Sequence, residues 1–593
     1  MGSHATRWAT SNSGAPSVTD HRLDPIVQIR DLVYSYRRQQ DRPALQGIDL
    51  EIAPGEFIAI AGRAGSGKST LCYALNGLIP HSFGGRMEGR VVVCGLDTRT
   101  TPVPELARHV GFVLQSAESQ LVGLTVDEDT SFGLENLGLP ADEIADRVAS
   151  ALRTVRLDGR PDASPWTLSG GQKQRLAIAA AIAFQPQILV LDNPTAELDP
   201  VGKQEVMATL AQLNRDRGVT VVIVNQELEE VLPHASRLVL MDHGRIVRQG
   251  RPADVIDAAD AVLTVGVKLP EVVQVAAELR ARGRWVGRLP MSVDEAIDQM
   301  HGLVSASSSP LPAPTVPPAP DARHADTIIE VDAASFAYPN GTRVIHDVSL
   351  QVHRGEFIAF MGPNGAGKTT LAKHFNGLLV PTTGRVVVDG EDTRRVGVAR
   401  LARKVGYVFQ NPDHQLFSRT TAEELAFGPT NLGWDRTRID AAVDRSLARL
   451  GGSARGGDDP FFMGIAERKL VAIASVLAME PDVLVLDEPA TGADHEAALR
   501  IMAYLVELHR QGLTIVIITH DVSLAANYAT RVVVVRDGAI ALDGPPDVVF
   551  RQAEALMACL VTPPQVAMLA EAIVPSAFTC RVGPMVAYLS EGR

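Results

Sequence analysis

The sequence predicts two consecutive α/β domains of one architecture, each followed by a small helical extension. At 593 residues the chain is too long for a single hydrophobic core. Short runs rich in β-branched residues alternate with helical stretches in each half, which is typical of a largely parallel sheet covered by helices. The segments "PGEFIAIAGRAGSGKSTL" (54–71) and "RGEFIAFMGPNGAGKTTL" (354–371) match nearly residue for residue, so the chain is a tandem repeat.

Composition and charge limit the class of protein. Hydrophobic residues make up 46% of the chain and charged residues 21%, as in an ordinary soluble globular protein. The net charge of -13 gives no support to a nucleic-acid partner, since such proteins usually carry a basic surplus. The four cysteines show no CxxC spacing, which argues against a zinc site or a disulfide framework and favours a reducing cytoplasm. No apolar run approaches the roughly 18 residues that a membrane helix needs, so we expect any membrane role to act through a partner.

The repeat and the shifts in composition define the expected domain boundaries. Residues 1–24 are polar and tag-like and are excluded from the fold. We expect the first α/β domain over 25–245 with its extension over 246–304, and the second over 325–540 with its extension over 541–593. Residues 305–324 between them hold six prolines and no apolar periodicity, which predicts an extended linker.

Each extension carries apolar residues at i, i+3, i+4 and i+7, the pattern of one helix stripe. The stripes are Val272, Val275, Ala276 and Leu279 in the first extension, and Val566, Leu569, Ala570 and Ile573 in the second. A stripe of this kind can pack on its own domain or against its twin. The sequence leaves both arrangements open, and packing on its own domain is at least as well supported.

Two segments fit the phosphate-binding pattern G-x-x-x-x-G-K-[ST], "GRAGSGKS" (62–69) and "GPNGAGKT" (362–369), and each lies between a predicted strand and a predicted helix. The glycines let backbone amides turn toward phosphate oxygens, and the helix N-terminus adds positive potential. Lys68 and Lys368 would reach the β- and γ-phosphates, while Ser69 and Thr369 would ligate Mg²⁺. The expected ATP-binding residues of these loops are Gly62, Gly65, Gly67, Lys68, Ser69 and Thr70 in the first copy, and Gly362, Asn364, Gly365, Gly367, Lys368, Thr369 and Thr370 in the second.

Acidic residues close one buried strand in each half, "ILVLD" (188–192) and "VLVLDE" (483–488). Asp192 and Asp487 can hold the magnesium shell, and Glu488 is placed to polarise an attacking water. A single aspartate after an apolar strand is often only a strand cap. With a phosphate loop upstream in the same domain, a site for a nucleotide and Mg²⁺ is the better interpretation.

The motif "LSGGQKQRLAIA" (168–179) is the signature of ATP-binding cassette (ABC) ATPases, and the chain resembles that family over nearly its whole length. The resemblance implies two tandem ABC-type P-loop nucleotide-binding domains that sandwich two ATP molecules head to tail. Pairing of the two domains within one chain is favoured, because it brings the intact signature to Glu488, and a head-to-tail dimer of chains is the alternative. Each site would combine the phosphate loop of one domain with the signature of the other, so that Ser169, Gly170, Gly171 and Gln172 act in trans.

Further roles follow from the same resemblance. Gln115 and Gln410 correspond to the Q-loop glutamines, which approach Mg²⁺, and Asp199 and Asp494 to the D-loop aspartates. His520 corresponds to the switch histidine. The adenine-stacking aromatics would be Tyr36 and Tyr338, although a core role remains open for both tyrosines. The implied magnesium ligands are Ser69, Gln115, Asp192, Thr369, Gln410 and Asp487.

The two copies differ at three motifs. Asn193 stands where the second copy has Glu488, and an amide cannot accept a proton as a carboxylate can. Gln226 stands opposite His520 and cannot become cationic. In the second copy "MGIAE" replaces "LSGGQ", which removes a hydroxyl and adds a β-branched side chain where backbone should approach phosphate. The degenerate positions of that signature are Gly464, Ile465, Ala466 and Glu467.

Because the sites are assembled in trans, all three losses fall on one of them. The site of Lys68, Asp192, Asn193 and Gln226 receives the altered signature. The site with Lys368, Gln410, Glu488 and His520 as its catalytic residues receives the intact one. We therefore expect one hydrolytic site and one site that binds ATP but turns it over poorly.

The Q-loop neighbourhood "GYVFQNPDHQLF" (406–417) resembles that of the ATPase components of energy-coupling factor (ECF) importers. The resemblance implies an ATP-hydrolysing motor, peripheral to the cytoplasmic face of the membrane. Its partners would be a transmembrane T component, which inserts arginine-bearing coupling helices beside the Q-loops, and an S component that binds a vitamin, vitamin precursor or trace-metal ion. The alternative is a two-cassette ATPase of another importer class, such as a sugar type. A ribosome or DNA factor is disfavoured, because the linker carries no charged helical arm and no coiled-coil or zinc insertion is present.

Overall fold

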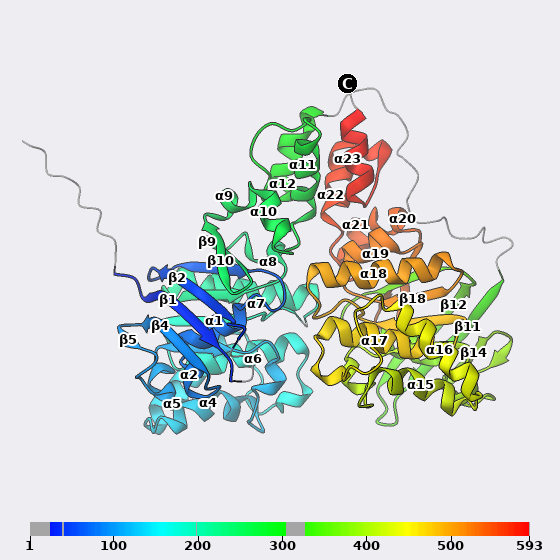
Figure 1. The fold of residues 1–593 in the computed structure, drawn as a ribbon, viewed down its shortest axis with the longest axis horizontal. Coiled ribbons are helices and arrows are strands. Elements are labelled where there is room, and N and C mark those ends of the chain that lie inside the picture. The colour runs from blue at the N-terminus through cyan, green and yellow to red at the C-terminus, as the bar shows by residue number, and fades with distance from the viewer. Residues whose placement is uncertain (1–23, 38–40, 197, 304–325, 592–593) are drawn as a thin grey trace, which may run out of the picture.

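The computed structural model describes residues 24–37, 41–196, 198–303 and 326–591. The predicted linker over 305–324, and residues 1–23 of the predicted N-terminal segment, lie outside these ranges. Two lobes of similar architecture stand side by side, and helices of the two extensions rise together above them (Figure 1). Among the described residues, no helix is long and apolar enough to cross a bilayer.

The first lobe is built on a six-stranded sheet. Its strands run parallel from β6 to β9, and β10 joins the edge antiparallel. Their order is β10 (Arg245–Gly250), β9 (Arg237–Asp242), β3 (Phe57–Ala61), β8 (Thr220–Val224), β7 (Ile188–Asp192) and β6 (Val110–Val113). The predicted parallel core is confirmed, with its carboxyl strand ends on one edge.

A second, antiparallel sheet of four strands completes the lobe. Its order is β2 (Leu45–Ile52), β1 (Val27–Ser35), β4 (Arg86–Val93) and β5 (Leu96–Asp97). The sequence did not distinguish these strands from the parallel ones, because short runs rich in β-branched residues, such as residues 91–93, occur in both sheets.

Alternating residues of the six-stranded sheet face two different cores. In β3, Phe57, Ala59 and Ala61 face the core shared with the larger helices. Ile58 and Ile60 face the core shared with the antiparallel sheet. This two-sided burial explains why the central strands are continuous apolar runs.

The helices of the first lobe follow its strands in chain order. In the helical part α6 packs against α4, α5 and α7. The helices are α1 (Lys68–Leu75), α2 (Leu78–His81), α3 (Val103–Leu106), α4 (Val126–Asn136), α5 (Ala141–Thr154), α6 (Gly170–Ala183), α7 (Pro200–Arg217) and α8 (Leu228–Val231).

The second lobe repeats this plan. The antiparallel sheet has the order β12 (Arg343–His353), β11 (Thr327–Ala337), β14 (Thr383–Val388) and β15 (Glu391–Asp392). The six-stranded sheet has the order β16 (Val405–Val408), β17 (Val483–Asp487), β18 (Thr514–Ile518), β13 (Phe357–Met361), β19 (Arg531–Arg536) and β20 (Ala539–Gly544). The helices are α13 (Lys368–Phe375), α14 (Val398–Leu401), α15 (Thr421–Asn431), α16 (Arg436–Arg449), α17 (Ile465–Leu477), α18 (His495–Arg510) and α19 (Val522–Tyr528).

The sheets extend beyond the predicted domain boundaries at 245 and 540. Strand β10 begins at Arg245 and β20 spans that second boundary, and each pairs antiparallel with the strand before it. Tight turns with positive φ at His243 and Gly244, and at Asp537 and Gly538, join these strands. Helical structure therefore resumes only at Pro252 and at Pro546.

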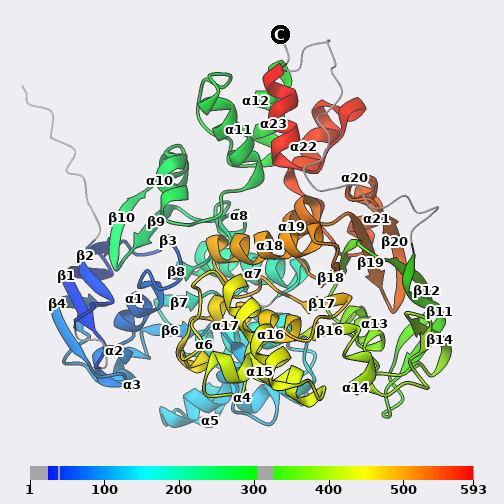
Figure 2. The ribbon, with the colours of Figure 1, turned by 45° about the vertical axis from the view of Figure 1, so that its right-hand side comes forward.

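The two extensions pack against each other. Helix α11 contacts α22 and α23, and α12 contacts α22, and Figure 2 shows these helices as one bundle. The predicted stripes, including Leu279 and Leu569, lie in one shared core. The extension helices are α9 (Pro252–Ile256), α10 (Ala259–Thr264), α11 (Glu271–Ala281) and α12 (Val293–Met300) in the first, and α20 (Pro546–Phe550), α21 (Ala553–Ala558), α22 (Gln565–Ile573) and α23 (Val582–Glu591) in the second.

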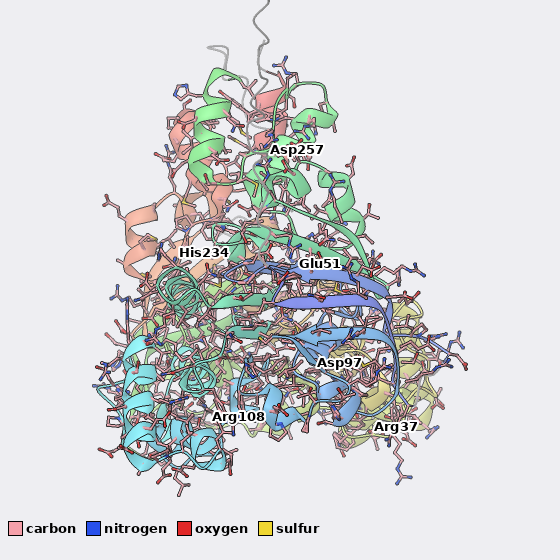
Figure 3. The ribbon with its side chains drawn as sticks, turned by 90° about the vertical axis from the view of Figure 1, so that its left-hand side faces the viewer. Arg37, Glu51, Asp97, Arg108, His234 and Asp257 are labelled. Atoms are coloured by element: carbon pink, nitrogen blue, oxygen red, sulfur yellow. The ribbon has the colours of Figure 1, made fainter. Side chains whose placement is uncertain are left out.

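Within the first extension, Asp257, which follows α9, is hydrogen-bonded to α11 and to the segment after α11. Its carboxylate accepts hydrogen bonds from Arg280 Nη2 at 2.7 Å and from the Leu289 amide at 3.0 Å. Figure 3 shows Asp257 above the strand that carries Glu51. These contacts fix the direction in which α11 leaves the lobe.

Candidate functional site: two phosphate loops facing two switch regions

Both phosphate loops depend on glycine. Gly62 and Gly362 have φ of 156° and 133°, and a Cβ there would lie 2.1 Å from the Met241 carbonyl oxygen or 2.0 Å from that of Val535. Gly65 and Gly365 also have positive φ, but a Cβ at either would meet no atom of the described residues within 4 Å. The first pair of glycines is needed for packing, and the second leaves the open side of each loop free for a phosphate.

The loop lysines are buried inside their own loops. Lys68 Nζ donates to the carbonyl oxygens of Gly62 and Arg63, both at 2.7 Å. Lys368 Nζ makes the equivalent bonds to Gly362 and Pro363 at 2.8 Å. Burial lowers the pKa of Lys68 to about 8, although Asp192 and Asp494 oppose the shift. An anion at the loop would raise this pKa and further stabilise the ammonium form.

The aspartates at the strand ends lie against the loop hydroxyls. Asp487 Oδ2 accepts from Thr369 Oγ1 at 2.9 Å and from Tyr407 OH at 3.1 Å. Among the described residues, the buried Oδ1 of Asp192 has no hydrogen-bond partner. A hydroxyl beside a carboxylate, and an unpaired buried carboxylate oxygen, are oxygen donors of the kind that Mg²⁺ prefers. Both sites therefore fit the implied ion.

Glu488 and His520 form a pair in the second lobe. His520 Nδ1 lies 2.9 Å from Glu488 Oε1, and Thr491 Oγ1 donates to Glu488 Oε2 at 3.0 Å. Burial lowers the pKa of His520, but the Glu488 carboxylate outweighs it, so the net pKa is raised. The second lobe thus brings together a carboxylate and a histidine beside its phosphate loop.

The first lobe lacks this pair. Asn193 is buried, and its Oδ1 has no hydrogen-bond partner among the described residues. Gln226 lies beside it on the wall of a cavity of about 280 Å³ that also includes Glu488 and His520. Next to Gln226, Lys203 Nζ bonds to Glu227 Oε2 at 2.6 Å and lies 2.7 Å from Glu230 Oε1. An ion cluster within the first half therefore lies beside Gln226, at positions where the second half has Ala498, Asp521 and Leu524.

The two signature segments occupy equivalent places but differ in structure. Ser169 caps α6 and forms a capping box with Gln172. Gly464 is the residue before α17 and provides no side-chain cap. The Ile465 side chain is 37% exposed and contacts Gly492, where a Cβ would lie 3.3 Å from Ile465 Cδ1. The altered signature therefore offers an apolar side chain instead of a hydroxyl.

The D-loop aspartates cross from one half to the other. The Ala64 amide of the first phosphate loop donates to Asp494 Oδ2 at 2.9 Å, and the Asn364 amide of the second donates to Asp199 Oδ2 at 3.4 Å. Asp199 also caps α7. The start of α7 lies against the signature helix, since a Cβ at Gly171 would be 3.3 Å from the Gly202 Cα. The halves thus face each other in head-to-tail fashion.

The predicted aromatic and Q-loop residues lie at the rims of the sites. The Tyr36 and Tyr338 hydroxyls hydrogen-bond to Thr70 and Thr370 at 3.0 and 3.2 Å. These bonds attach both rings to the helices that begin at the phosphate loops. Gln115 and Gln410 are exposed just after β6 and β16.

Sequence reasoning missed a second glutamine in each Q-loop. Gln120 Oε1 accepts from the Leu114 amide at 3.0 Å, and Gln415 Oε1 accepts from the Phe409 amide at 3.2 Å. Both side chains close their loops into a compact turn. The repeated "Q-x-x-x-x-Q" spacing was the available signal.

Comparison with known proteins agrees with this geometry. The family model described as ABC transporter matches residues 45–196 and 345–491. The chain belongs to this family, and its two halves are the ATPase cassettes of an ABC transporter.

Several relatives are similar over almost the whole chain. A protein of Caldanaerobacter subterraneus subsp. tengcongensis named as an ABC transporter ATP-binding protein is 39% identical over 92% of this chain and 96% of its own. One from Methanosarcina acetivorans with a similar name is 39% identical over 92% of this chain and 90% of its own. Among solved structures, CbiO1 of Clostridium perfringens, part of the ABC transporter complex CbiONQ, is 35% identical. It covers 42% of this chain and 97% of its own, with a TM-score of 0.36.

Proposed function

We propose that the chain is the ATP-hydrolysing motor of an ECF-type importer, with one hydrolytic site and one degenerate ATP site. The observation that carries the division of labour is the Glu488–His520 pair, 2.9 Å apart, whose counterparts are Asn193 and Gln226. A carboxylate–histidine pair of this kind can orient a water, accept its proton and stabilise the charge that develops on the phosphate. Two amide side chains cannot accept the proton of the water.

The hydrolytic site uses residues of both halves. Lys368 and the loop amides bind the phosphates, Glu488 orients and polarises the attacking water, and His520 fixes the Glu488 carboxylate and faces the transferred phosphate. Thr369, Asp487 and Gln410 would hold Mg²⁺, which when bound would neutralise charge on the phosphates. The start of α6, with Ser169 as its cap, supplies hydroxyl and amide donors from the other half.

The degenerate site keeps its phosphate loop and Asp192, but it lacks a catalytic carboxylate, a switch histidine and an intact signature. Lys68, Ser69 and Asp192 suffice for binding ATP with Mg²⁺. Ile465 covers the signature edge, and Asn193 provides no base. We infer that ATP here holds the two halves together and turns over slowly.

The importer class is proposed from the Q-loop pattern and from the surface around it. The rings of Phe417 and Phe427 pack edge to face with their centroids 4.5 Å apart, and both residues are exposed. In the first half a cavity of about 370 Å³ beside the Q-loop is lined mainly by apolar side chains, including Phe112, Val122 and Phe132. Surfaces of this kind suit an amphipathic helix of a partner.

We propose a transmembrane T component as the donor of these helices and an S component as the solute receptor, with the chain peripheral at the cytoplasmic face. A sugar-type two-cassette motor is the alternative. Co-purification of a T-type membrane protein without a periplasmic binding protein would favour the first proposal, and recovery of a periplasmic binding protein would favour the second.

A matched pair of substitutions tests the division of labour. Glu488→Gln should lower steady-state ATP hydrolysis about 100-fold or more, because it removes the general base. Asn193→Gln places the same amide at the degenerate site and should change turnover little. Equal losses in the two variants would contradict the proposal.

A further inference from the structure

One ion pair crosses between the halves beside the switch histidine. Lys268 of the first extension places Nζ 3.3 Å from Oδ2 of Asp521, the residue that follows His520 in the second lobe. Both side chains are partly buried, with 27% and 30% exposed. They line the same cavity as Glu488 and His520.

The backbone at Lys268 is attached to the other switch region. A parallel β-bridge joins Lys268 to Glu227, which follows Gln226. The Lys268 main chain therefore contacts the degenerate switch segment, while its side chain reaches the competent one. Burial lowers the pKa of Lys268, but Asp521, Glu227 and Glu271 outweigh burial and raise it, so the amine stays charged at neutral pH.

Asp521 is well placed to transmit this contact to His520. Its Oδ1 caps α19 by accepting from the Leu524 amide at 3.1 Å, while its Oδ2 meets Lys268. A neighbouring contact of the same extension reinforces the arrangement, because Ser523 Oγ donates to Glu271 Oε1 at 2.6 Å. The first extension thus holds the start of α19 by two side chains.

The repeat has no equivalent of this ion pair on the degenerate side, although Glu229 and Gln565, at the positions of Ser523 and Glu271, are also hydrogen-bonded. Residue 562, which is 294 positions after Lys268, is threonine. The residue equivalent to Asp521 is Glu227, and it pairs instead with Lys203 of its own half. Lys203 in turn corresponds to Ala498, which has no charge. The cross-half ion pair therefore serves only the switch segment that carries a histidine.

We propose that Lys268 is a positioning residue for the hydrolytic site, acting through Asp521 to hold His520 against Glu488. The inference rests on the proposed assignment of hydrolysis to the Glu488 site. In this proposal the first extension is a structural part of the second half's active centre. The packing of the extension bundle would then affect the rate of ATP hydrolysis.

The test compares Lys268→Thr, which installs the residue of the other copy, with Lys268→Arg and with the matched control Thr562→Ala. We expect Lys268→Thr to lower kcat for ATP about tenfold while KM stays within about twofold, because a small misplacement of a catalytic group affects the chemical step. Lys268→Arg should restore most of kcat, since it keeps the charge. Thr562→Ala should be unchanged.

Asp521→Asn, alone and combined with Lys268→Thr, decides whether the two residues act together. The double variant should lose no more kcat than the worse single variant, as expected for partners in one interaction. If Lys268→Thr does not fold, Asp521→Asn must still show the selective loss of kcat.

Other outcomes would overturn the proposal. They are an unchanged kcat in Lys268→Thr, a loss that Lys268→Arg does not restore, or additive losses in the double variant. Glu488→Gln is measured in parallel. Activity retained in Glu488→Gln would refute the proposed function, whereas its loss beside a normal Lys268→Thr would refute only the role of Lys268.

Discussion

Glu488 and Asn193 occupy the same unusual backbone conformation, with φ of 49° and 48°. Asparagine adopts this left-handed region readily, whereas glutamate does so at a cost of about 1–3 kcal/mol. The backbone amides of both residues donate to the neighbouring strand, to Ile518 and Val224 respectively, each at 2.9 Å. The strained residue therefore stands only at the site that we propose to be hydrolytic, and the relaxed one at the degenerate site.

The His520 contact with Glu488 predicts a pH-dependent stability. The folded pKa of His520 is raised from its ordinary value of 6.5, because the carboxylate outweighs burial. A raised folded pKa gives stabilisation that is complete below the unfolded pKa and is lost as the pH rises through the folded pKa. We expect the thermal unfolding temperature of nucleotide-free wild type to exceed that of His520→Gln most at about pH 5.5 and least at about pH 8.5. A pH-independent difference would contradict the charged pair.

Motif residues could be predicted from the sequence because each has a fixed spacing from a loop or a strand end. The phosphate loops and acidic strand ends lie where those patterns indicated. Lys268 could not be predicted in the same way. Its partner Asp521 is 253 positions away, and only the packing of one half on the other brings them together.

Among the helices, the two that follow the signature segments, α6 and α17, differ in how they begin. The Ser169 side chain accepts from the Gln172 amide, and the Gln172 side chain accepts from the Ser169 amide, at 3.3 and 3.0 Å. At the start of α17 glycine replaces the capping serine, and Glu467 replaces the glutamine. The first helix can present an ordered turn to a nucleotide, and the second has an acidic side chain close to that turn.

Restoring the cap of α17 should affect stability and leave turnover unchanged. Gly464→Ser should raise the free energy of unfolding by a few tenths, about 0.3 kcal/mol, since glycine is itself a fair cap. Among the described residues, a Cβ there would meet only the movable Glu467 side chain, with Oε2 at 2.5 Å. Ser169→Ala should cost about 1 kcal/mol and also lower ATP hydrolysis, because its helix serves the hydrolytic site. Denaturant unfolding and ATPase assays check both, and a gain of turnover in Gly464→Ser would contradict the assignment.

The parallel character of the six-stranded sheets could be predicted from the sequence, since apolar runs alternate with helices, but the order of their strands could not. The antiparallel sheets and the edge strands β10 and β20 could not be separated by periodicity alone. Their residues alternate between buried and exposed just as half-buried strands of any sheet do.

At the scale of the whole molecule, the extension bundle and the D-loop contacts hold the two halves together. Helix α11 meets α22 and α23 in one apolar core, and Glu271 and Gln565 bond to each other's helix starts, to the Val566 and Val272 amides at 3.0 and 3.3 Å. The sequence left the packing of the stripes open. An apolar helix stripe can pack on its own domain or against the other stripe, so its packing partner is seen only in the assembled fold.

A substitution that destabilises this bundle should reduce ATP turnover, although it lies outside both phosphate loops. Leu569→Ala removes a fully buried side chain and should cost about 2–5 kcal/mol. We expect ATP hydrolysis to fall in step, because the bundle keeps the D-loops opposite the phosphate loops. Leu263→Ala, at a position 49% exposed in the first extension, is the matched control. Thermal unfolding and ATPase rates check both, and full activity of a destabilised Leu569→Ala would show that the bundle does not support closure.

The central claim is that hydrolysis occurs at the phosphate loop of the second half only. The most direct measurement is to trap nucleotide with vanadate during turnover, photo-crosslink it through its base, and map the labelled peptides by mass spectrometry. We expect ADP on peptides near Tyr338 and Lys368, and uncleaved ATP on peptides near Tyr36 and Lys68. ADP in equal amounts at both sites would contradict it.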